Sequence, residues 1–182
     1  MPDRFYNLEV AGCSRKLSVM NISDHMAIAS FVILGDMELV SSAAKELVKK
    51  LPPADLIMTA EAKGIPLAQE IARLLHMKYF VVARKSVKGY MQHPLIVKDH
   101  SITTNGKQIL CLMDQDIERV RNHRVILVDD VISTGGSMEA LSKLAEKAGA
   151  QVAARAAVLA EGDAIGRRGY YVLGNLPLFP AE

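Results

Sequence analysis

Tryptophan is absent from this chain of 182 residues, which holds only two cysteines and few other aromatic residues. Cys13 and Cys111 lie far apart and match no spacing of a metal site or of a redox pair. We therefore expect two buried or unreactive thiols, as is usual for a protein of a reducing cytoplasm.

Long hydrophobic runs are also missing, although 50% of the residues are hydrophobic. No run approaches the length that a membrane-spanning helix needs, and the first residues lack the apolar core of a signal peptide. The net charge is only +2, and no basic run is interleaved with aromatic residues, so nothing indicates a nucleic-acid surface. We expect one cytoplasmic domain, residues 1–182, that binds neither membranes nor nucleic acid.

The most informative segment, residues 125–137, is Val-Ile-Leu-Val-Asp-Asp-Val-Ile-Ser-Thr-Gly-Gly-Ser. Its aliphatic start is typical of a strand that is buried on both faces of a parallel sheet. Asp129 and Asp130 then fall at the carboxyl end of that strand, where open α/β sheets bind their ligands. Two adjacent carboxylates are costly there without partners, so the pattern indicates a binding site.

The turn that follows favours a phosphate group. Gly135 and Gly136 let the backbone approach an anion closely, and Ser133, Thr134 and Ser137 add hydroxyl donors. Backbone N–H groups at the start of the next helix complete the cradle. Ribose 5-phosphate fits this combination, because its hydroxyls can donate to the aspartates. A Walker-type loop is excluded because no lysine follows the glycines. A glycine-rich connection without a ligand is the alternative.

The rest of the chain alternates predicted strands with predicted helices. Strands are expected at residues 55–60, 79–83, 108–113, 125–132, 151–160 and 170–173, with a further apolar stretch at 26–34. Helices are expected to begin at Asp36, near Gly64 and after the glycines at 135–136. Residues 86–106 lack periodicity, and we expect a mobile excursion there. The alternation predicts an α/β fold with a mostly parallel central sheet flanked by helices.

Two more segments are expected at the same edge of this sheet. Exposed backbone donors beside a cation suit a diphosphate, and a loop between a strand and a helix offers both. That loop is Glu61, Ala62, Lys63 and Gly64, and the basic pair Arg84 and Lys85 follows the next predicted strand. An ordinary connection and a solvated basic pair are the alternatives.

Residues 125–137 resemble the phosphoribosyl pyrophosphate (PRPP) signature of type I phosphoribosyltransferases. The resemblance extends over about residues 35–160, and it is closest to the adenine-type branch of the purine enzymes. It implies that Asp129 and Asp130 hold the ribose hydroxyls and that residues 133–137 hold the 5′-phosphate. It also implies the type I phosphoribosyltransferase fold with a small N-terminal hood, residues 1–35, which shapes the base pocket.

The same resemblance implies an activity and a set of partners. Residues 61–64, with Arg84 and Lys85, would hold the pyrophosphate. Lys88 and Tyr90 would belong to a mobile loop, residues 86–106, that closes over the substrate and excludes water. The reaction would transfer the ribosyl group of PRPP to a purine base, adenine or hypoxanthine/guanine, with Mg²⁺ bound alongside PRPP. Members commonly form homodimers.

The acceptor base and its proton acceptor stay open. Adenine-type members usually carry an acidic residue beside a tyrosine in the mobile loop, but residues 86–107 contain no glutamate. Other possible proton acceptors there are His93, Asp99 and His100. Phe31, Tyr90 and Phe179 could stack on a base or pack in the core. Two alternatives remain: a non-catalytic PRPP- or nucleotide-binding regulator, for which a DNA-binding module would be expected, and a phosphoribosyltransferase for a non-purine acceptor.

Overall fold

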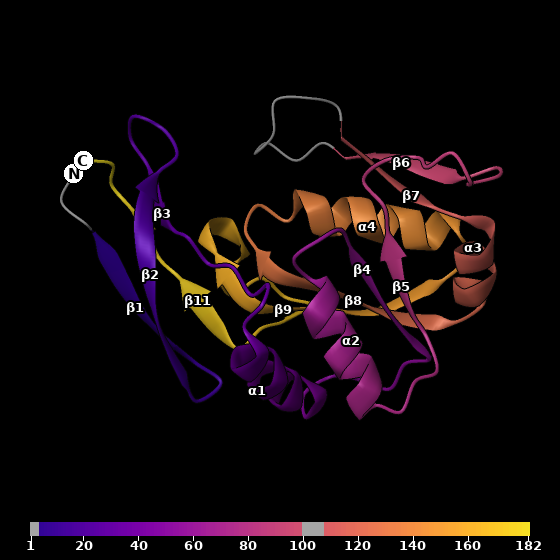
Figure 1. Ribbon diagram of the computed structural model, residues 1–182, viewed down its shortest axis with the longest axis horizontal. Coiled ribbons are helices and arrows are strands. Elements are labelled where there is room, and N and C mark those ends of the chain that lie inside the picture. The colour runs from indigo at the N-terminus through magenta and orange to yellow at the C-terminus, as the bar shows by residue number, and fades with distance from the viewer. Residues whose placement is uncertain (1–3, 100–107) are drawn as a thin grey trace.

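The centre of the molecule is a six-stranded sheet with parallel pairing in the part of the chain that the structure describes, residues 4–99 and 108–182. In this computed structural model the strand order is β10-β9-β8-β4-β5, and β11 also pairs with β9. The strands are β4 (Leu56–Ala60), β5 (Phe80–Ala83), β8 (Arg124–Ile132), β9 (Gln151–Glu161), β10 (Tyr170–Tyr171) and β11 (Gly174–Leu176). The predicted parallel α/β architecture is confirmed (Figure 1).

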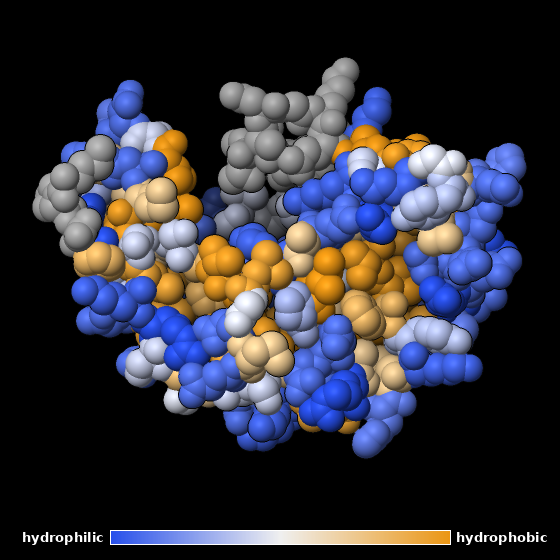
Figure 2. All heavy atoms as spheres, viewed as in Figure 1, coloured by the Kyte–Doolittle hydropathy of each residue, from blue (hydrophilic) through white to orange (hydrophobic). Residues whose placement is uncertain are grey.

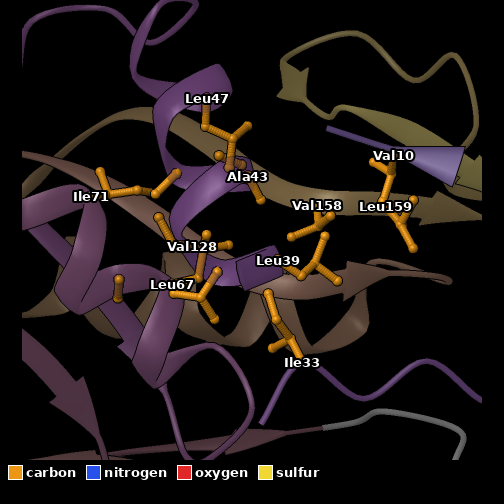
Figure 3. Close-up of a cluster of buried hydrophobic side chains, with 14 of the residues drawn as sticks. Val10, Ile33, Leu39, Ala43, Leu47, Leu67, Ile71, Val128, Val158 and Leu159 are labelled. Atoms are coloured by element: carbon orange, nitrogen blue, oxygen red, sulfur yellow. The ribbon is translucent and has the colours of Figure 1, made fainter. Parts of the chain in front are cut away.

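Helices cover both faces of this sheet. α1 (Met37–Val48) and α2 (Ile65–Leu74) pack on one face, and α4 (Gly136–Lys147) packs on the other, near the short α3 (Asp114–Val120) (Figure 1). The aliphatic residues at 125–128 are fully buried between these layers, as expected for a central parallel strand. Figure 3 shows how Leu39 and Leu67 from the two helices meet Val128 of β8 in one of the two hydrophobic cores.

A second, antiparallel sheet forms the hood, with the strand order β1-β2-β3-β12. Its strands are β1 (Phe5–Val10), β2 (Cys13–Asn21), β3 (Ala27–Ala29) and β12 (Leu178–Phe179). Figure 1 shows it at the left, beside β11 and the C-terminal end of the chain. β12 comes from the far end of the sequence and adds a fourth strand to this sheet, whose other strands lie within residues 5–29.

The predicted excursion at residues 86–106 holds regular structure that the sequence did not indicate. Its residues Leu95–Asp99 form β6, which pairs antiparallel with β7 (Gln108–Leu112). The weak periodicity of this stretch did not indicate a strand, because β6 is stabilised by its pairing with β7. The predicted mobility of this segment stays a prediction, and His100 lies outside the described residues.

The strand predicted at 170–173 ends earlier than expected. β10 covers only Tyr170 and Tyr171, and β11 continues the pairing along β9 three residues later. Between β9 and β10 lies a short 3-10 helix, Gly162–Ala164. Of the helices in the described residues, none is both long and apolar enough to cross a membrane.

Candidate functional site

A cavity of about 410 Å³ opens where the carboxyl ends of β4 and β8 meet the starts of α2 and α4. Parallel strands bring their carboxyl ends to one edge, and ligands of such folds bind at that edge. Two separate loops of the sequence form the walls. The lining residues are Glu61, Ala62, Lys63, Lys85, Asp129, Asp130, Val131, Ile132, Ser133, Thr134, Gly135, Gly136, Ser137 and Met138.

Two carboxylates lie side by side in this cavity. Asp130 is only 2% exposed, and its backbone N–H donates a hydrogen bond of 2.8 Å to Oδ1 of Asp129. Burial, together with the neighbouring charge of Asp130, raises the pKa of Asp129 above the ordinary carboxyl value. The pair is therefore an acceptor site whose charge is poorly compensated by the protein.

Lys63 supplies the nearest positive charge. Its Nζ lies 3.0 Å from Oδ2 of Asp130, and the Lys63 side chain remains 48% exposed. The two atoms form an ion pair without the angles of a hydrogen bond, so among the described residues Oδ2 of Asp130 has no hydrogen-bond donor. A buried carboxylate oxygen in this state is free to accept a bond from a ligand hydroxyl.

The glycine-rich turn leads directly into α4. Gly135 has a left-handed backbone (φ 87°), which glycine adopts without strain, and its carbonyl accepts a bond of 2.8 Å from Glu139 N–H. The N-cap residue, Gly135, has no side chain to cap this helix, and the first N–H group, that of Gly136, donates a long bond of 3.4 Å to Oγ1 of Thr134. Open N–H groups at a helix start attract an anion.

Gly64 fixes the distance between the two loops. A Cβ atom at this residue would lie 2.4 Å from Oγ1 of Thr59, 3.1 Å from Cα of Asp129 and 3.1 Å from the carbonyl oxygen of Val128. Only glycine leaves room for so close a backbone approach. The loop at 61–64, which contains a cis peptide bond between Glu61 and Ala62, thus lies directly against the end of β8.

The two residues of the basic pair have different surroundings. Lys85 lines the cavity, whereas Arg84 forms an ion pair with Glu61 and donates a bond of 3.3 Å to Tyr90 Oη. Burial raises the pKa of Glu61, but the bond from the Lys85 backbone N–H and the charge of Arg84 outweigh it and lower that pKa. The structure therefore places Glu61 and Lys85 at the cavity and turns Arg84 toward a second hollow behind it.

The candidates for base stacking and for proton transfer are not gathered in this cavity. Phe31 is buried in the core, and the Phe179 ring packs edge-on to Tyr6 in the hood with 5.8 Å between the ring centroids. Tyr90 is 62% exposed, and His93 is exposed as well. Asp99 ends β6, and Lys88 is half-buried. The identity of the general base stays open.

Sequence reasoning missed one residue beside the turn. Nη1 of Arg167 lies 3.5 Å from the carbonyl oxygen of Thr134 and 2.7 Å from where a Cβ of Gly135 would be. The sequence shows the basic pair Arg167-Arg168, which could have marked an anion site. Its place beside residues 134–135 depends on the fold and could not be predicted from the sequence. Met138, Val131 and Ile132 were also not expected to line the cavity.

Taken together, a parallel α/β sheet, a carboxylate pair and a helix-start anion site define a protein that binds a sugar phosphate. Comparison with known proteins agrees with this class. Residues 36–173 match the family model described as the phosphoribosyl transferase domain. This chain belongs to that family.

Relatives with curated names lie in the purine branch of the family. The chain is 34% identical over 151 residues to an adenine phosphoribosyltransferase of Nocardia farcinica, covering 81% of this chain and 76% of that protein. It is 31% identical over 137 residues to a hypoxanthine/guanine phosphoribosyltransferase of Methanococcus voltae, covering 75% of this chain and 69% of that protein.

Solved structures show the same fold. The adenine phosphoribosyltransferase of Thermoanaerobacter pseudethanolicus superposes with a TM-score of 0.64 at 26% identity, covering 78% of this chain and 82% of that one. The adenine phosphoribosyltransferase of Rhodothermus marinus gives a TM-score of 0.65 at 23% identity, and the match covers 94% of this chain and 93% of that one. The latter includes the hood, so the type I phosphoribosyltransferase fold extends over almost the whole chain.

Proposed function

We propose that this protein transfers the ribosyl 5-phosphate group of PRPP to a purine base, adenine or hypoxanthine/guanine, and releases pyrophosphate. The observation that carries the proposal is the cavity in which the carboxylate pair, the glycine-rich turn and the loop at 61–64 meet. The named relatives, which are adenine and hypoxanthine/guanine phosphoribosyltransferases, support the purine acceptor.

In this proposal the cavity divides into three subsites. Asp129 and Asp130 accept hydrogen bonds from the ribose hydroxyls, and Oδ2 of Asp130 is the acceptor that lacks a donor within the described chain. Residues 133–137 bind the 5′-phosphate through hydroxyls and through backbone N–H groups at the start of α4. Residues 61–64 and Lys85 face the pyrophosphate, and Arg84 supports them through its ion pair with Glu61.

The reaction breaks the bond between ribose C1 and the pyrophosphate oxygen and forms a bond from C1 to a ring nitrogen of the base. The electron pair of the broken bond leaves with pyrophosphate, and the nitrogen gives up its proton to a base not yet identified. The chain supplies orientation and charge: the helix start fixes the phosphate, and Lys63 and Lys85 offset the charge that builds on the leaving group.

Magnesium fits this site as a partner of PRPP rather than as a resident ion. No cluster of three metal-ligating side chains occurs in the described residues, but Mg²⁺ is commonly held by one or two carboxylates together with phosphates. Asp129 and Asp130 are the carboxylates within the cavity. When bound, the ion would neutralise the diphosphate.

The oligomeric state and the location complete the proposal. Hydrophobic residues lie across the middle of one face of the molecule (Figure 2). Val32 and Leu34, in the segment before α1, and Met37, at its first position, are exposed. A homodimer, common among the enzymes that this chain resembles, would cover some of this surface. A cytoplasmic location agrees with two free, buried cysteines.

One assay tests the activity and separates it from the alternatives. The protein is incubated with PRPP and Mg²⁺ and with adenine, hypoxanthine, guanine or a pyrimidine, while pyrophosphate release and nucleotide formation are measured. We expect release that depends on a purine base. Release with a pyrimidine alone would show a different acceptor, and PRPP binding without release from any base would indicate the non-catalytic regulator.

A further inference from the structure

A separate cavity, of about 260 Å³, lies beside the first turns of α4, on the side of β9 and β10, and is different from the hollow next to Arg84. It shares no lining residue with the cavity described above. Three arginines line it, Arg155 of β9 and the neighbours Arg167 and Arg168, together with Ser142, Tyr170 and Glu139. We call it the arginine pocket.

The guanidinium groups of this pocket lack counterions. No carboxylate of the described residues lies within 4.0 Å of them, and the one carboxylate in the lining, Glu139, pairs with Lys143 at 2.7 Å. Like charges that share a pocket repel one another, and the single carboxylate of the lining cannot offset three guanidinium groups, so a bound anion would relieve the repulsion. The charge is therefore arranged to receive a ligand.

Arg155 is held in place by the protein. Its Nε donates a bond of 2.9 Å to Oγ of Ser142, which is 4% exposed and itself donates 2.8 Å to the carbonyl oxygen of Met138. Because Nε is fixed, the outer nitrogens of Arg155 stay available at the floor of the pocket. The edge formed by the two terminal nitrogens of a guanidinium is suited to bidentate binding of phosphate oxygens.

We propose that the arginine pocket is a second anion site, distinct from the sugar-phosphate cavity, that binds a phosphate group. Arg155 binds from the floor, and the exposed Arg167 and Arg168 bind from the rim. Arg167 also contacts the carbonyl oxygen of Thr134, so the pocket adjoins the glycine-rich turn from behind. The group could be inorganic phosphate or the phosphate of a nucleotide, since the recognising chemistry is the same. This inference does not depend on the proposed transfer reaction.

The test follows the Arg155 Nε–Hε resonance by NMR in the full-length, ¹⁵N-labelled protein. The resonance is assigned by its loss in Arg155→Lys, and inorganic phosphate is titrated at constant ionic strength. We expect a saturable shift whose dissociation constant rises at least about fivefold in Arg168→Gln, because a charged hydrogen bond to the anion is lost. Arg168 is exposed, so this variant should keep the thermal midpoint of the wild type.

Two control variants separate this site from its surroundings. Arg121→Gln removes an exposed arginine near the C-terminal end of α4, roughly 10–15 Å along the helix from the residues that line the pocket, and should leave the titration unchanged. Ser137→Ala alters the sugar-phosphate cavity and should also leave it unchanged. A shift that does not saturate, or that is equal in wild type and Arg168→Gln, would overturn the proposal, as would a shift that weakens in Ser137→Ala.

A parallel titration with adenosine monophosphate distinguishes the two sources of the phosphate group. If the shift of the Arg155 resonance gives a lower dissociation constant for adenosine monophosphate than for inorganic phosphate, the pocket is assigned to a nucleotide. An equal or higher dissociation constant would assign it to free phosphate. No response to either compound would refute the anion site.

Discussion

Gly64 shows at the scale of one residue how the backbone prepares the site. Gly64→Ala would place a methyl group 2.4 Å from Oγ1 of Thr59, and Thr59 is itself fully buried. We expect the free energy of unfolding to fall by about 1–3 kcal/mol, as for other overpacked positions. Urea denaturation measures this loss.

The matched control is Gly89→Ala, where a Cβ would meet no atom within 4 Å. Its free energy of unfolding should change by less than about 0.5 kcal/mol. Equal stability of the two variants would contradict the close approach of the loop at 61–64 to β8.

Asp129 gives a second prediction at this scale, based on pH. Because the folded protein raises the pKa of this carboxyl above its ordinary value of 3.8, the folded state binds the proton more tightly than the unfolded chain. Its contribution to stability is therefore complete below that value and is lost as the pH rises through the raised pKa. Asp129→Asn cannot titrate, so the stability of wild type relative to this variant should fall as the pH rises.

Denaturation of both proteins at a series of pH values from about 4 to 8 checks this trend. A stability difference that stays constant over the series would show that Asp129 is an ordinary, solvated carboxylate.

At the scale of elements, ion pairs from Arg15 of β2 to Asp36 and Glu38 join the hood to α1. Asp36, the N-cap of α1, accepts a bond of 3.1 Å from Leu39 N–H and a bidentate pair from Arg15 of β2, with distances of 2.6 and 2.8 Å. The hydrogen bonds from Arg15 lower the pKa of Asp36. The cap and the ion pair therefore depend on the same carboxylate.

Two substitutions of Asp36 separate these contributions. Asp36→Ala removes the cap and the ion pair, and we expect a loss of about 2 kcal/mol in the free energy of unfolding. Asp36→Ser keeps a capping oxygen and loses only the ion pair, so it should lose less than about 1 kcal/mol. Equal losses in the two variants, measured by thermal denaturation, would rule out a role for the cap.

The elements also show what sequence patterns can and cannot predict. The apolar run at 125–128 and the turn after it predicted β8 and the start of α4, because their pattern depends on local physics. β6 escaped prediction, since its own periodicity is weak and its pairing with β7 stabilises it. The side-chain direction of Arg84 could not be predicted either, because it is set by Glu61, 23 residues earlier.

At the scale of the whole molecule, the hood and the core share one hydrophobic cluster. Leu8, Val10 and Leu17 of the hood hairpin are buried with Leu159 of β9 and with side chains of α1. A shared core of this kind predicts that the described parts of the chain unfold as one cooperative unit, in agreement with the expectation of a single domain.

Val10→Ala tests this cooperativity. The substitution removes two buried methyl groups, which should lower the free energy of unfolding by about 2 kcal/mol. Native-state hydrogen exchange should show the same loss for amides of β8 as for those of β1. Met20→Ala, at a residue of β2 that is 56% exposed, is the control and should change neither. A loss confined to β1 and β2 would show that the hood unfolds separately.

The central claim is that neighbouring acids and the amide-lined turn behind them hold ribose and its phosphate. Its most direct test is the dissociation constant of PRPP with Mg²⁺, measured by calorimetry for wild type and Asp130→Asn. Loss of a charged acceptor should weaken binding by about 10- to 100-fold, while the thermal midpoint shows that the variant is folded. An unchanged dissociation constant in a folded variant would contradict the claim.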